Sequence, residues 1–465
     1  MRFGGVAFVA ALLVAAGARA ETLTDALARA YQTNPLLNAE RAKLRSTDEN
    51  VPGALAGYRP QVALSLSAGL QGVRNLLPGG FNPDGTAAPP FSQSANLTPW
   101  SAGLTLNQNL FNGFKTGNQV RQAEAQVLSG REALRLVEQS VLLDAATAYM
   151  GVLANQGLVE AQRANLQFLR ELRATTQRRY DAGDVTPTDV AQSEARLNRG
   201  IADLNNAEIA LAVSQATYAQ VIGVSPGRLS QPDSVDRLLP RQRDQAVAIG
   251  RAENPAILTA TFDTDAAQKA VNIAEAALYP TVGVQASVSR NFQTDTTLGS
   301  TRTDQASVVG NVNVPVYDGG VASAQVRQSK ELLSQARILL DRARTQTDLA
   351  VVTAWVTNEG SRINLNAAQS EVRAAEIAVA GVQREAQAGQ RTTLDVLNSQ
   401  QDLTAARSRL IIAQRDRVVA SYTLLSAIGR LNRGRLALAT PDYDPMVHYQ
   451  QVRDAWFGVR TPSGQ

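Results

Sequence analysis

Four segments of the chain alternate between apolar and small polar residues with a period of two. In the first segment, Val62, Leu64 and Leu66 occupy one face, while Ser65 and Ser67 occupy the other. Successive side chains of a β-strand point to opposite faces, so this pattern predicts strands with one apolar and one polar face. The predicted strands cover about residues 60–73, 99–112, 280–293 and 305–318.

Aromatic residues stand at the ends of these segments, and polar loops join the segments in pairs. The loops, 72–98 and 291–304, are rich in Gly, Pro, Asn, Thr and Asp, which predicts exposed loops. Strands of about ten residues with aromatic ends are typical of a membrane β-barrel with lipid outside and water inside. A soluble antiparallel sheet with one wet face would show the same alternation. The aromatic residues are Tyr58, Trp100, Phe111, Phe114, Tyr279, Phe292 and Tyr317.

Outside the strands the chain is predicted to be helical. No proline interrupts 113–183 or 319–389, and shorter helical segments, 23–55 and 246–278, precede the strands. The apolar residues are mostly Ala, Leu and Val, with Gln, Arg, Glu and Asn between them. This composition suits long helices packed side by side as in coiled coils, with one wet face. The predicted long helices cover about 113–182, 185–222, 319–388 and 391–428.

The two halves of the chain repeat one order of elements. Asn34 recurs as Asn254 after 220 residues, whereas Gly183 recurs as Gly389 after 206 residues. The offset changes between two strands, which indicates a longer and a shorter version of one loop, and a constant register elsewhere indicates an internal repeat. The predicted parts are a signal peptide at 1–20, a first repeat at 21–223, a linker at 224–242, a second repeat at 243–429 and a tail at 430–465.

The first twenty residues have the features of a secretory signal. Arg2 precedes an apolar run at 6–16, and Ala-Arg-Ala at 18–20 resembles a cleavage site, so the mature chain is expected to begin at Glu21. No later segment has the roughly 20 apolar residues that a membrane helix needs. Any membrane-spanning part is therefore expected to consist of strands.

Composition argues against most chemical functions. The net charge is only +4, and the arginines are interspersed with acids, so no basic stripe indicates nucleic-acid binding. The absence of Cys excludes thiol chemistry and a lipid-modified amino-terminal cysteine, and His448 is the single histidine. We expect no catalytic residue, cofactor or metal site. The G-x-S-x-G pattern at 223–227 follows a predicted helix rather than a strand, which indicates a helix stop and not a hydrolase elbow.

Four strands cannot close a barrel, and open sheet edges are not tolerated in lipid. Three copies of the chain would supply twelve strands, an even number within the range of known barrels. The long helices would continue the wall of the same tube on one side of the membrane.

Several motifs resemble the TolC-type outer-membrane efflux and secretion channels, over nearly the whole mature chain. They are Asn-Pro in the first helix of each half, Leu-Phe-Asn-Gly at 110–113, Val-Tyr-Asp-Gly-Gly at 316–320 and the segment 388–397. The resemblance implies an α+β membrane protein: a homotrimer whose twelve-stranded barrel continues as a long periplasmic α-helical barrel. It also implies outer-membrane lipid, a periplasmic adaptor (membrane fusion protein) and an inner-membrane pump of RND or ABC type as partners. The alternative is a periplasmic coiled-coil scaffold or adhesin without a pore.

The same resemblance assigns roles to residues at the two turns between long helices. It places Asp395 in an acidic constriction ring that binds cations, with Asn398 at the family's second acidic position. Arg391, Thr188 and Asp189 match a latch that holds the closed state. The tyrosine of that latch is Ala386 here, so we expect fewer bonds in the closed state.

For a single aspartate at such a turn, helix capping is the alternative explanation, because a carboxylate is favoured at a helix N-terminus. Glycine at each turn supplies the left-handed residue that ends a helix. The turns also resemble adaptor-docking grooves, with Ala in place of the family's usual Val. Their residues are Ala182, Gly183, Asp184, Ala388, Gly389 and Gln390.

Overall fold

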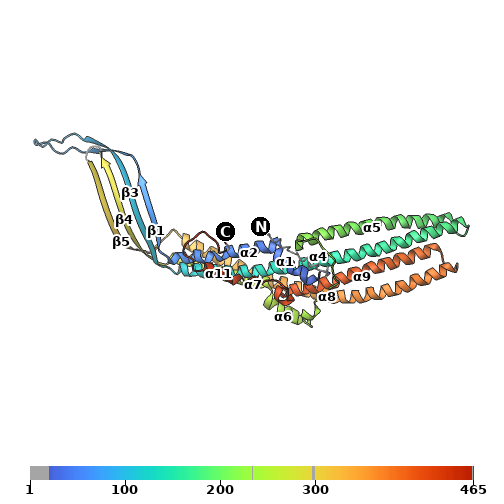
Figure 1. The fold of residues 1–465 in the computed structure, drawn as a ribbon. Coiled ribbons are helices and arrows are strands. Elements are labelled where there is room, and N and C mark those ends of the chain that lie inside the picture. Colours follow the sequence, from blue (N-terminus) through green and yellow to red (C-terminus); the bar gives the residue numbers. More distant parts are fainter. Residues whose placement is uncertain (1–19, 233, 296–298, 463, 465) are drawn as a thin grey trace, which may run out of the picture. The chain divides into compact units, whose positions relative to one another are not determined.

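A computed structural model describes residues 20–232, 234–295, 299–462 and 464 (Figure 1). The signal peptide expected at 1–20 lies outside the described residues, apart from Ala20. The chain divides into two compact units, which we call the helical unit and the strand unit. The helical unit comprises Met1–Lys43, Arg131–Thr259 and Asp341–Asp444; the strand unit comprises Leu44–Gly130, Ala260–Leu340 and Pro445–Gln465.

The strand unit contains one antiparallel sheet in the order β1-β3-β4-β5, with β2 also paired to β3. β1 and β2 follow one another along β3, so the sheet has four positions across. Its strands are β1 (Gln61–Ala68), β2 (Gln71–Leu77), β3 (Phe91–Asn112), β4 (Thr281–Asp295) and β5 (Gly299–Asn313).

The register of the sheet aligns the alternating residues into rows. Because pairing partners point to the same face, Val62, Leu106, Ala286 and Val308 form an apolar row across four strands. One row of the opposite face consists of small polar residues, Ser67, Ser101, Asn291 and Thr303. The two faces therefore differ in polarity as the period-two pattern predicts.

Strand boundaries differ from the prediction at four places, and two of them involve proline. The strand expected at 60–73 breaks into β1 and β2 opposite Pro99, which has no N–H to donate across the ladder. The strand expected at 305–318 ends at Asn313, shortly before Pro315. About half of the loop expected at 72–98 is strand, because β2 pairs with the first part of β3. Likewise β4 and β5 extend into the loop expected at 291–304.

The junction between β3 and the following helix depends on glycine. Gly113 has φ 64°, and a Cβ at this position would lie 2.7 Å from the carbonyl oxygen of Ala276. A side chain would therefore require the backbone to shift. At the corresponding end of the second half, Asp318 Oδ2 accepts a hydrogen bond from the N–H of Ala322 (2.6 Å). This carboxylate satisfies one of the free N–H groups of the helix that begins there.

The long helices agree closely in length between the two halves, and Figure 1 shows them as two helical hairpins. The helix α4 (Lys115–Asp181) is followed by α5 (Pro187–Ile222), and α8 (Val321–Gln387) by α9 (Thr393–Ala427). The shorter helices are α1 (Leu23–Thr33), α2 (Pro35–Asp48), α3 (Asn50–Leu55), α6 (Arg243–Glu253), α7 (Pro255–Glu275), α10 (Arg433–Leu436) and α11 (Pro445–Val452).

Among the described helices, none combines the length and the apolar character needed to cross a membrane.

The ends of α5 and α9 are held by equivalent side chains of the two halves. Asn34 donates from Nδ2 to the carbonyl of Val221 over 3.0 Å, and Asn254 donates from Nδ2 to the carbonyl of Ala427 over 2.9 Å. Both asparagines are buried, so each bond satisfies polar groups that water cannot reach. Gly223 (φ 91°) ends α5, as expected for a helix stop.

Candidate gating site at the helical hairpin turns

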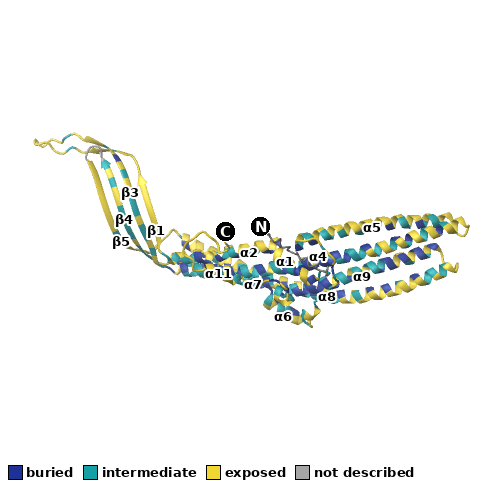
Figure 2. Cartoon of the chain, viewed as in Figure 1, coloured by how far each residue is buried: buried dark blue, intermediate teal, exposed yellow. Residues whose placement is uncertain are grey.

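The two turns at the ends of the helical hairpins have the same backbone geometry. Gly183 and Gly389 have φ 86° and 75°, in the left-handed region that glycine adopts without strain. The N–H of Asp184 donates to the carbonyl of Arg179, and that of Gln390 to the carbonyl of Glu385, both over 2.8 Å. The predicted docking residues at 182–184 and 388–390 are all exposed (Figure 2).

Asp189 and Asp395 cap the outgoing helices. Asp395 Oδ2 accepts hydrogen bonds from the N–H of Thr392 (3.0 Å) and from its hydroxyl (2.9 Å), while the N–H of Asp395 donates back to Thr392 Oγ1. Asp189 makes the same reciprocal bonds with Thr186. These are capping boxes, which satisfy free N–H groups at a helix start. The bonds from Thr392 hold the pKa of Asp395 below its usual value. Capping is thus one role of both carboxylates.

Arg391 is placed differently from the latch that the resemblance implies. Its Nε lies 2.9 Å from Glu385 Oε2, an ion pair within one hairpin. Among the described residues, no hydrogen bond or ion pair joins Arg391 to Thr188 or Asp189. Arg391 pairs with Glu385 because that carboxylate lies across the same turn. Asp189 instead accepts a hydrogen bond from Thr186.

A residue that the sequence analysis missed connects the two hairpins. Arg196 on α5 donates from Nη2 to Asn398 Oδ1 on α9 over 3.1 Å, and from Nη1 to Gln401 Oε1. Asn398 was expected near a constriction, and the structure makes it one end of this link. One signal could have identified Arg196: the second half has Asp402 at the equivalent position, so the copies differ there in charge.

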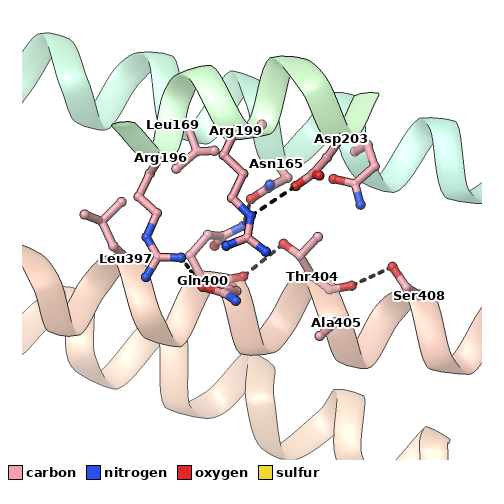
Figure 3. Close-up of a pocket in the computed structure, with 13 residues that line it drawn as sticks. Asn165, Leu169, Arg196, Arg199, Asp203, Leu397, Gln400, Thr404, Ala405 and Ser408 are labelled. Carbon is pink, nitrogen blue, oxygen red and sulfur yellow. Dashed lines mark hydrogen bonds and ion pairs between the residues drawn. The ribbon is translucent and has the colours of Figure 1, made fainter. Parts of the chain in front are cut away.

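Arg196 borders a pocket of about 160 Å³ between α4, α5 and α9 (Figure 3). Gln400 on α9 reaches across this pocket and donates to Asn165 Oδ1 on α4 over 3.4 Å. Arg199 also lines the pocket, but its Nε lies 3.9 Å from Asp203 on its own helix. Arginine and amide side chains therefore contribute hydrogen bonds between the hairpins at this pocket.

Comparison with known proteins places this geometry in a family. The family model for outer membrane efflux proteins matches residues 26–224 and 249–430. The chain belongs to the outer membrane efflux protein family. The resemblance to TolC-type channels is thereby confirmed, and this family consists of channels rather than enzymes.

Relatives among the outer membrane efflux and secretion proteins match most of the chain. Outer membrane efflux protein BepC of Brucella suis biovar 1 (strain 1330) is 41% identical over 98% of this chain and 95% of its own length. Alkaline protease secretion protein AprF of Pseudomonas aeruginosa is 25% identical over 76% of this chain and 74% of its own length. Outer membrane protein TolC of Escherichia coli (strain K12) is 24% identical over 89% of this chain and 83% of its own length.

A solved outer membrane channel has a similar fold. The Campylobacter jejuni CmeC outer membrane channel aligns with a TM-score of 0.75 at 14% identity, covering 93% of this chain and 89% of that chain. At this identity the likeness shows the fold alone. The fold is that of TolC-like channels, mostly helical with one β-sheet.

Proposed function

We propose that this protein is the passive exit duct of a tripartite efflux pump or a type I secretion system. Three copies would form a twelve-stranded barrel in the outer membrane, continued by an α-helical barrel in the periplasm. The observation that carries the proposal is the sheet of the strand unit, which has apolar rows on one face, small polar rows on the other and two open edges. The family membership supports it.

The open edges favour closure by other copies of the chain. Within the described residues, β1 and β5 each have a strand partner on one side only. Unpaired N–H and C=O groups cost several kcal/mol each in hydrocarbon, which is why membrane sheets close into barrels. Pairing β5 of one copy with β1 of the next would remove both edges. Four strand positions from each of three copies would give a barrel of twelve strands.

An exposed seam on α8 supports the same oligomer. Leu349, Val356, Ile363 and Ile377 are 68%, 62%, 64% and 74% exposed and recur at multiples of seven residues. A heptad spacing is the mark of helices that pack against a partner as in coiled coils. Exposed apolar residues also occur on α5 at Ile201, Ile209 and Val213. In a trimer these two seams would be covered by neighbouring copies.

The internal repeat gives the tube its number of units. The equivalent bonds of Asn34 and Asn254 support two structural repeats per chain, at 21–223 and 243–429. Three chains would then supply six near-equivalent units. The leader at 1–20 would be removed on export, and the tail at 430–465 has no counterpart in the first repeat.

The hairpin turns would form the gate. In a trimer Asp395 would become a ring of three carboxylates that attracts cations, with Asn398 beside it. Arg196 would hold α5 to α9 in the closed state through Asn398 and Gln401. Arg391, Thr188 and Asp189 would approach only if the pair between Arg391 and Glu385 opens or if neighbouring copies bring them together. The exposed turns at 182–184 and 388–390 would dock the periplasmic adaptor.

The partners follow from the relatives. One relative is named an efflux protein and another an alkaline protease secretion protein, so the family's names include both efflux and protein secretion. The duct would therefore work with an adaptor and an inner-membrane pump of RND or ABC type. Substrate choice would reside mainly in the pump.

The test is to purify the mature protein from the outer-membrane fraction and measure its mass in detergent and its conductance in planar bilayers. We expect heat-resistant trimers that form discrete channels. A monomer without conductance would instead indicate the periplasmic scaffold or adhesin.

A further inference from the structure

The carboxyl-terminal segment exposes its largest apolar side chains. After α11, Trp456, Phe457 and Val459 are 66%, 96% and 99% exposed, and the segment is drawn largely in the exposed colour in Figure 2. Single exposed apolar residues are ordinary, but a cluster of this kind within four residues marks an interaction site.

This segment follows α11, which contacts the strand unit through a few residues. His448 Nδ1 on α11 lies 3.0 Å from Asp48 Oδ2, which is buried. Tyr449 packs against a small core formed by Val51, Ala123 and Val127. Since all of these residues belong to the strand unit, α11 fixes where the exposed segment starts within that unit.

Arg59 ties the exposed segment to the foot of the sheet. Its guanidinium carbon lies 4.7 Å from the centre of the Trp456 ring, and its Nη1 donates to the carbonyl of Ala455 over 2.5 Å. Arg59 stands two residues before β1, where the apolar row with Val62 begins. Trp456 is therefore held where the sheet starts.

Other aromatic residues gather at the same end of the sheet. Tyr58, Phe114 and Tyr279 line one pocket, together with the Gly113 that joins β3 to α4. All three aromatic residues are about half or more exposed. Aromatic side chains concentrate at the level where membrane hydrocarbon meets headgroups.

We propose that the segment 456–459 is a second membrane contact, an interfacial anchor that inserts Trp456, Phe457 and Val459 among phospholipids beside the barrel. The partner is a phospholipid surface. Exposed Arg453 and Arg460 flank the apolar residues and carry the charge that pairs with lipid phosphates. The inference rests on the proposed barrel, since it uses the sheet to set the depth of the segment.

The experiment uses two single-tryptophan variants of the full-length protein. One carries Trp100→Phe and Trp355→Phe, leaving Trp456 as the reporter. Its matched control carries Trp355→Phe and Trp456→Phe, leaving Trp100 in β3, where it stacks on Phe292 (6.2 Å between ring centres). Both are reconstituted into vesicles of phosphatidylethanolamine and phosphatidylglycerol whose acyl chains are brominated either near the headgroup or near their ends.

We expect bromine near the headgroup to quench most of the Trp456 fluorescence and bromine near the chain ends to quench little. Acrylamide in the water should quench Trp456 less in vesicles than after unfolding. If brominated lipid quenches Trp100 but acrylamide still reaches Trp456, the proposed lipid contact of 456–459 is contradicted. The proposed barrel is not contradicted by that result. If Trp456 is shielded from acrylamide but is not quenched by brominated lipid, protein rather than lipid covers it. That result also contradicts the proposed lipid contact. If brominated lipid leaves Trp100 unquenched as well, the barrel itself is wrong.

Discussion

Arg196 on α5 donates a hydrogen bond to Asn398 on α9 over 3.1 Å, and this bond joins the two helical hairpins. Gln401 accepts a second bond from the same guanidinium. Because the link runs between hairpins and not within one, its loss should free the hairpins to separate at their turns.

We predict that Arg196→Ala favours the open gate. Each hydrogen bond of this kind contributes about 1 kcal/mol net, which corresponds to about a five-fold shift between closed and open states. Single-channel recording in planar bilayers should show more frequent or larger openings. Arg199→Ala is the matched control, since Arg199 lines the same pocket but lies near Asp203 on its own helix. Equal effects of the two substitutions would argue against a specific link.

The cap of α9 should set the local stability of the second turn. Thr392→Ala removes the hydroxyl that bonds Asp395, and loss of an N-cap costs about 1 kcal/mol. Faster hydrogen exchange of the first turn of α9 would report this loss. Thr392→Ser keeps the hydroxyl and should exchange nearly like the parent protein; if it exchanges as fast as Thr392→Ala, the hydroxyl is not the cause.

The same cap should weaken in acid. The pKa of Asp395 lies below its ordinary value of 3.8 because Thr392 donates two hydrogen bonds to the carboxylate. The stabilisation is therefore fully present above pH 3.8 and is lost as the pH falls through the lower pKa of the folded state. Asp395→Asn should remove this pH dependence from the exchange of α9, and it should also reduce block of the channel by divalent cations. If the pH dependence persists in Asp395→Asn, Asp395 is not the titrating group of the cap. If the divalent-cation block persists, Asp395 does not form the cation-binding ring.

Replacement of His448 should loosen α11. His448→Ala removes a hydrogen-bond partner of the buried Asp48, with a cost of about 1–3 kcal/mol. We expect a lower midpoint of thermal unfolding and faster tryptic cleavage after Arg453. His448→Asn, which can retain a hydrogen-bond donor to the Asp48 carboxylate, is the control. Its midpoint of thermal unfolding should fall less than that of His448→Ala.

The two faces of the sheet should respond differently to charge. Val308→Arg places a cation on the apolar row of β5, with an expected cost of about 2–4 kcal/mol if that row faces lipid near the bilayer midplane. Its neighbour Ser307 lies on the opposite face, so Ser307→Arg should assemble and instead change conductance. The yield of heat-resistant trimers in the outer membrane distinguishes them, and equal yields would be evidence against a lipid-facing row.

Much of the fold could be predicted because it follows from local patterns. The alternation around Val62 and Val308 reappears as aligned rows, since strand side chains alternate whatever lies beyond the strand. The hairpin turns at Gly183 and Gly389 were predictable because a left-handed residue must end each helix there. Strand ends were predicted less well, because ladder pairing carried β2 and β4 into segments whose composition suggested loops.

The candidate gating site, like the fold, could be predicted from the sequence only in part. The sequence alone determined that Asp189 and Asp395 stand in the first turns of helices, where the backbone itself favours a carboxylate. Only the tertiary structure decided that Arg391 pairs with Glu385 and that Arg196 reaches Asn398. Such pairs depend on how each helix is rotated about its axis, and that rotation results from packing along the whole hairpin rather than from any local run of residues.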